Sequence, residues 1–132
     1  GYSHFEHVAY GMRSELTQFL GGEDSIKISR LRLTNQTDSP RHLSVTGYVE
    51  WVLGFNRAVT APYVVTEIDS ETGALFAMNP LDAEFGQRIA FFDLGGRQTS
   101  TTSDRGEFLG RNGSLEKPGA VFRAGGLSGA SG

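Results

Sequence analysis

Alternation of apolar and polar side chains is the feature of this sequence that most constrains its fold. It is clearest in residues 43–53, where Val45, Val49 and Trp51 share one parity and polar residues occupy the other. Because successive side chains of a strand point to opposite faces, this period of two predicts a half-buried β-strand, the most secure in the chain. Trp51 is the only tryptophan, and its parity favours core packing over stacking on a sugar ring.

The same period recurs in segments separated by turn residues. Residues 8–20 are expected to form one long strand, with a helix as the alternative because Met, Glu, Leu and Gln favour helix. Residues 63–68 and 74–78 are expected to form a hairpin, in which Gly73 takes a positive φ. Residues 89–94 are expected to form a further strand.

Apolar residues change parity in the segment that follows residue 25. Ile28 and Leu31 lie on opposite parities of what is otherwise a continuous strand. This change predicts either a β-bulge near Ser29 and Arg30 or a strand that is buried on both faces. The sequence does not decide between the two.

Composition supports an all-β fold. Glycine accounts for 18 of the 132 residues, roughly twice its usual share, and this fits many tight turns between short strands. We therefore expect one antiparallel β-sandwich domain over residues 1–132. The net charge of −3 gives no reason to expect nucleic acid or an anionic membrane as a partner, and the lack of cysteine excludes disulfides.

Histidines and carboxylates do not suggest a self-contained active site. His4 and His7 would face opposite sides of a strand, His42 is remote in sequence, and no third ligand is apparent, so we expect no metal and no cofactor. Glycoside cleavage uses paired carboxylates, but no pair stands out, so we expect no catalytic residue here. Glu50, beside Trp51, is expected to be a buried, hydrogen-bonded acid. The carboxylates considered were Glu50, Glu67, Asp69, Asp104 and Glu107.

Residues 104–118, DRGEFLGRNGSLEKP, gather charged side chains around glycines on an expected surface loop. The planar guanidinium of arginine can donate two parallel hydrogen bonds to vicinal hydroxyls, a carboxylate or a phosphate. The candidate carbohydrate-binding residues are Arg105, Glu107, Arg111 and Asn112. The alternative is a solvated loop with local salt bridges, each worth about 0–1 kcal/mol.

Several segments resemble the N-terminal β-sandwich region of the glycoside phosphorylases, which include cellobiose and chitobiose phosphorylases. The resemblance is strongest to the phosphorylase-like domain of cyclic β-1,2-glucan synthases, and it covers nearly the whole chain. In the family pattern two residues separate FLG from NG, whereas here only Arg111 does. The segments are GYSHFEH, IKISRLRLTN, LSVTGYVEWVLG, APYVVTEIDSETGALFAMNP, EFGQRIAFFDL, FLGRNG and EKPGAV.

The resemblance implies a supersandwich-like fold of large twisted antiparallel sheets, of which this chain is a fragment. A helical catalytic domain would follow and supply the catalytic acid, so the chain would be non-catalytic and would shape one wall of a glycan site. The implied partners are that helical domain and a glucan or oligosaccharide, with a possible homodimer and no direct membrane contact. The implied location is the cytoplasmic side of the bacterial inner membrane, in a membrane-anchored enzyme whose fragment is itself soluble. The alternative is a free-standing carbohydrate-binding module.

Overall fold

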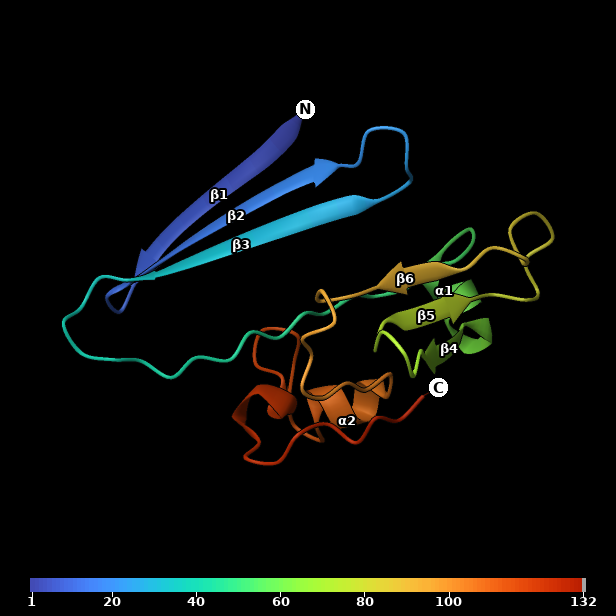
Figure 1. Ribbon diagram of the computed structural model, residues 1–132. Helices are drawn as coiled ribbons and strands as arrows, with labels where there is room; N and C mark the ends of the chain where they lie inside the picture. Colours follow the sequence, from blue (N-terminus) through green and yellow to red (C-terminus); the bar gives the residue numbers. More distant parts are fainter. Residues whose placement is uncertain (132) are drawn as a thin grey trace. The chain divides into compact units, whose positions relative to one another are not determined.

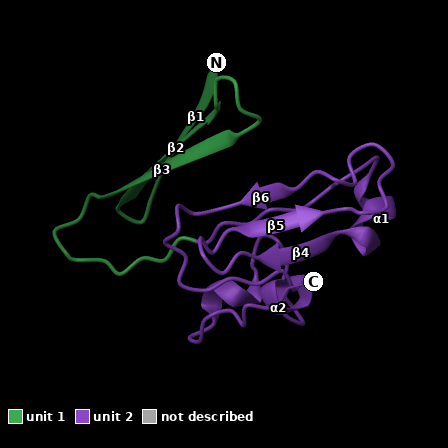
Figure 2. Ribbon diagram, turned by 45° about the vertical axis from the view of Figure 1, so that its right-hand side comes forward, with its two compact units in different colours: residues 1–45 green, residues 46–132 purple. Residues whose placement is uncertain are grey.

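A computed structural model describes residues 1–131. Its regular secondary structure is mostly strand, in two three-stranded antiparallel sheets, with few and short helices (Figure 1). This confirms the predicted all-β antiparallel class. The chain divides into two compact units, residues 1–45 and 46–132 (Figure 2).

The first unit is a meander of three strands in the order β1-β2-β3. They are β1 (Tyr2–Ala9), β2 (Met12–Leu20) and β3 (Lys27–Asn35). The prediction of one strand over residues 8–20 is correct from Met12 onward but wrong at its start, because the chain reverses at Tyr10 and Gly11. Both residues have positive φ, 51° and 74°, and a tyrosine in that conformation is a rare event that the sequence does not signal.

The β-bulge, one of the two alternatives that the sequence left open, is absent from β3. Its register with β2 runs without interruption from the Lys27–Leu20 pair to the Asn35–Met12 pair, and Ser29 and Arg30 each have one partner. A continuous strand therefore carries apolar side chains on both faces. These are not buried within the described residues, since Ile28, Leu31 and Leu33 are about two-fifths exposed (41%, 43% and 39%).

The second sheet has the order β4-β5-β6. Its strands are β4 (Val65–Ile68), β5 (Leu75–Met78) and β6 (Ala90–Phe92). The predicted hairpin is confirmed, because β4 pairs with β5 around a turn in which Gly73 has φ 73°. The Asp69 carboxylate holds this turn by accepting from the Thr72 amide at 2.9 Å and from its hydroxyl at 2.5 Å.

Short helices precede and follow the three strands of the second unit. They are α1 (Arg57–Thr60), η1 (Ala61–Tyr63), α2 (Arg105–Leu109) and η2 (Gly119–Phe122). The predicted surface loop at residues 104–118 thus begins as a helix. Asp104 caps α2 by accepting from the amides of Gly106 and Glu107, at 2.7 and 3.1 Å, and Gly110, with φ 74°, ends it.

The predicted strand at residues 43–53 is wrong: the segment lies outside both sheets. Residues of its two parities instead contact two different neighbours. Gly47 packs so closely on Phe92 that a Cβ there would lie 2.7 Å from the ring. Tyr48, on the other parity, stacks on Phe108 of α2 with ring centroids 5.0 Å apart. An alternating pattern therefore shows only that the two sides of an extended segment contact different neighbours. This holds for an extended connection as well as for a strand.

The core of the described residues is small. Its buried apolar side chains are those of Ala74, Ala77 and Phe108. Trp51 is only half-buried, so its predicted place in the core is wrong as far as residues 1–131 are concerned. The carbonyl of Leu53 nevertheless ties this segment to the sheet by accepting from the buried Asn79 amide at 2.8 Å.

Candidate functional site

Arg105, on α2, is part of a polar network with Tyr48, Glu50 and Arg57. Its guanidinium donates to the Tyr48 hydroxyl at 2.6 Å and to the Glu50 carboxylate. Tyr48 donates to the same carboxylate oxygen at 2.9 Å, and Arg57 forms an ion pair with that oxygen at 2.9 Å. The network joins α1, α2 and the extended segment between the layers of the second unit.

This network favours an ionised carboxylate beside a neutral phenol. The Tyr48 hydrogen bond, followed by the charges of Arg57 and Arg105, lowers the pKa of Glu50. Burial, followed by the hydrogen bond to Glu50, raises the pKa of Tyr48. Glu50 is hydrogen-bonded as expected but not buried, since its side chain is 32% exposed. Two guanidinium groups on one carboxylate leave a net positive charge at this site.

Glu107, two residues further along α2, faces a different set of partners. Its carboxylate accepts from the Thr102 hydroxyl at 2.6 Å and from the Ser128 amide and hydroxyl at 2.8 and 2.7 Å. Arg123 lies 3.4 Å away, and the Glu107 side chain is only 13% exposed. The hydroxyl of Thr102, followed by that of Ser128, lowers the pKa of Glu107. These intramolecular bonds engage both carboxylate oxygens, which leaves them little capacity for a ligand.

Arg111 and Asn112 lie at the apex of a tight glycine turn. Gly113 has no room for a side chain, because a Cβ there would collide with the carbonyl oxygen of Leu109. Both apex residues are exposed. Within residues 1–131, no hydrogen bond or ion pair engages either side chain. Of the four candidates, these two therefore keep their polar groups free, and no contact joins them to Arg105 or Glu107 in that part of the chain.

The sequence also contained signals for residues that were not among the carbohydrate-binding candidates. Tyr48 and Glu50 share the polar parity of residues 43–53, which places two polar groups on one side of an extended segment. Arg57 follows Asn56, a favoured helix cap that accepts from the Val59 amide at 3.1 Å. Arg57 and Arg105 both form ion pairs with Glu50. This convergence depends on tertiary structure, which local sequence patterns do not predict.

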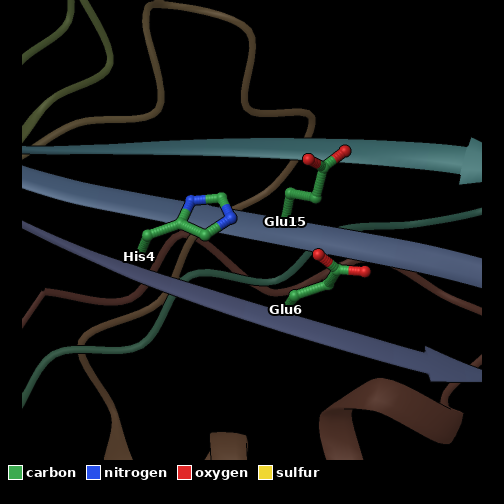
Figure 3. A group of neighbouring side chains, drawn as sticks. All are labelled: His4, Glu6 and Glu15. Carbon is green, nitrogen blue, oxygen red and sulfur yellow. The ribbon is translucent and has the colours of Figure 1, made fainter.

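In the first unit, a group of polar side chains forms on the sheet, from His4, Glu6 and Glu15. Their ligand atoms lie within 4.8 Å of one another (Figure 3). The Arg13 guanidinium lies 3.0 Å from Glu6 and 3.6 Å from Glu15, and so offsets one of their two negative charges. A cation would have to displace it, so the group is an ion-pair cluster of an exposed sheet. The absence of a bound metal stays a prediction.

No helix within residues 1–131 is both long enough and apolar enough to cross a membrane.

Comparison with known proteins gives two matches. Residues 1–132 match the family model described as the supersandwich domain of glycosyl hydrolase 94. The chain is also similar to the cyclic beta-(1,2)-glucan synthase NdvB of Rhizobium meliloti (strain 1021), with 37% identity over 131 residues. That alignment covers 99% of this chain but 5% of the relative, so the chain spans about a twentieth of the relative's length.

Proposed function

Because the chain belongs to the supersandwich domain family of glycosyl hydrolase 94, we propose that it forms one wall of the glycan site in a larger enzyme that builds or phosphorolyses glucans. The similarity to a cyclic beta-(1,2)-glucan synthase favours β-1,2-linked glucan as the ligand class. The chain itself is non-catalytic in this proposal. A helical catalytic domain elsewhere in the enzyme supplies the reacting groups, and the enzyme is held at the cytoplasmic face of a bacterial membrane.

One observation supports the glycan wall above the others. Arg111 and Asn112 present uncommitted polar groups on a turn whose glycine backbone packs closely against that of Leu109 and Gly119. Both side chains end in planar polar groups that suit sugar hydroxyls. The guanidinium of Arg111 donates hydrogen bonds, and the amide of Asn112 both donates and accepts them. This packing against neighbouring backbone would also lower the entropy cost of ordering the turn on binding. The Arg105 network is a weaker candidate, because its guanidinium is already bonded to Glu50 and Tyr48.

Kinetics of the full-length enzyme test the proposal. Replacing Arg111 and Asn112 together by Ala removes polar groups that touch nothing else in the described chain. Loss of a buried hydrogen bond to a sugar costs about 1–3 kcal/mol, so we expect the double variant to lose roughly tenfold or more in kcat/KM for glucan. The matched control is Arg97→Ala, which removes another exposed arginine.

Titration calorimetry on the isolated chain distinguishes the wall from a free-standing carbohydrate-binding module. A wall supplies only part of the site, so β-1,2-glucan oligosaccharides should bind the isolated chain weakly or not at all. Tight binding by the isolated chain would favour the module. Unchanged kinetics of the double variant together with no binding would refute both functions for this turn.

A further inference from the structure

Glu107 connects the two ends of the segment that carries Arg111 and Asn112. It belongs to α2, from which the segment departs. Its carboxylate also binds the chain that follows η2, through Arg123 at 3.4 Å and through the Ser128 amide at 2.8 Å. The orange α2 and the red tail lie side by side in the second unit (Figure 1). One carboxylate therefore joins the outgoing and the returning chain.

Between these two attachments the turn packs closely against neighbouring backbone. A Cβ on Gly113 would lie 3.1 Å from the Gly119 amide, and one on Gly119 would lie 2.9 Å from the Leu109 carbonyl oxygen. Ser114 and Lys117 exchange backbone bonds of 3.3 and 3.1 Å. The turn thus packs against the start of η2, and its position depends on whether η2 and the tail stay against α2.

The bonding of Glu107 differs from that of other acids on this segment. Its side chain is 13% exposed and accepts from hydroxyl, amide and guanidinium groups. Glu116, by contrast, is exposed and makes no hydrogen bond or ion pair within residues 1–131. Four donors from the protein converge on this one carboxylate and fill its acceptor sites. Such a satisfied network rigidifies the groups that it joins, so the arrangement favours a positioning role.

We propose that Glu107 is a positioning residue that holds the turn of Arg111 and Asn112 in its glycan-binding geometry by binding the tail at Arg123 and Ser128 to α2. This inference rests on the proposed function for its glycan part. The holding of the turn can be measured without any glycan.

The first measurement is amide hydrogen exchange in the full-length protein. Glu107→Gln keeps the shape of the side chain but removes its charge and one acceptor oxygen. We expect faster exchange at residues 110–119 in this variant, with unchanged exchange in the β4–β5 turn at residues 69–73. Ser128→Ala removes one donor and should give a smaller change in the same residues. Glu116→Gln is the control with the same charge change.

The second measurement is a double-mutant cycle in the kinetics of the full-length enzyme on β-1,2-glucan oligosaccharides. A residue that acts through another gives non-additive effects. We expect Glu107→Gln to raise KM by roughly tenfold with kcat little changed. In a chain in which Arg111 and Asn112 have already been replaced by Ala, Glu107→Gln should raise KM little further.

The outcomes separate the inference from the proposed function. Unchanged exchange at residues 110–119 in both the Glu107 and the Ser128 variants would overturn the inference whatever the kinetics. Additive kinetic effects would overturn it too, because Glu107 would then act independently of the turn. Faster exchange without any kinetic effect of the Arg111 and Asn112 replacements would support the holding of the turn and refute the proposed glycan function.

Discussion

Gly113 and Gly119 both lie against the carbonyl oxygen of Leu109, and neither position has room for a side chain. Such crowding is a property of single residues, and it explains the glycine after Asn112, whereas the positive φ of Gly110 explains the glycine before Arg111. The charged residues suggested a site from sequence alone. The positions of the glycines determine that Arg111 and Asn112 are the charged and polar residues at the apex of the turn.

Gly113→Ala should destabilise the second unit. The new methyl group would collide with the Leu109 carbonyl, and overpacking of this kind costs about 1–3 kcal/mol. Gly125→Ala is the control, since a Cβ there meets nothing within 4 Å. Urea unfolding of the two variants checks this, and equal midpoints would show that the turn relaxes freely.

The low pKa of Glu107 predicts how stability depends on pH. The hydrogen bonds from Thr102 and Ser128 hold its folded-state pKa below the unfolded value, which is about 4.3 for glutamate. Its contribution is therefore fully present above about pH 4.3 and is lost as the pH falls through the lower folded-state pKa. Unfolding free energies measured from about pH 6 to pH 3 should fall less steeply for Glu107→Gln than for the wild-type chain. Parallel curves would mean that the carboxylate contributes nothing, and Glu116→Gln should follow the wild type.

At the scale of elements, the sequence predicted the parts that local chemistry determines. The β4–β5 hairpin was predictable because Asp69 and Gly73 favour a turn whatever surrounds them. Residues 43–53 show the opposite case. Their alternation is real, yet Gly47 faces Phe92 while Tyr48 faces Phe108, and neither contact is a strand ladder. Pairing partners lie far away in sequence, so period two cannot distinguish a strand from an extended connection.

The candidate site also has a part that was predictable from local sequence and a part that was not. The exposure of Arg111 and Asn112 followed from the glycines on either side of them. The partners of Arg105 and Glu107 did not, because Tyr48 and Ser128 lie 57 and 21 residues away. Residue types identified the right segment, and tertiary contacts assigned the individual roles.

Helix α2 should depend on its cap. Asp104 accepts from two amides of the first turn, and loss of such a cap costs about 1 kcal/mol. Asp104→Ala should lower the unfolding free energy by that amount, whereas Asp104→Asn, which can still accept, should lower it by only a few tenths. Equal losses in both variants would show that charge, and not the cap bond, is what matters.

At the scale of the whole molecule, the first sheet carries an apolar face that residues 1–45 do not themselves cover. Phe5, Leu16 and Leu31 lie opposite one another across β1, β2 and β3, and Phe5 is 57% exposed. The outer edges of β1 and β3 are also unpaired there. Exposed edges and apolar faces favour association.

We therefore predict that the isolated 132-residue chain associates as its concentration rises. Light scattering should show a growing mass that Leu31→Gln reduces. Arg30→Gln, a change on the opposite face of the same strand, should leave it unaffected. A monomer at high concentration would refute the prediction.

The central claim is that the turn of Arg111 and Asn112 contacts glycan in the full-length enzyme. Amide hydrogen exchange with and without saturating β-1,2-glucan oligosaccharides tests it most directly, because a ligand bound on the turn should suppress local opening at those residues. The account predicts slower exchange at residues 110–113 in the presence of glucan, with no change in the hairpin turn at residues 69–73. Equal exchange at residues 110–113 in both conditions would contradict it.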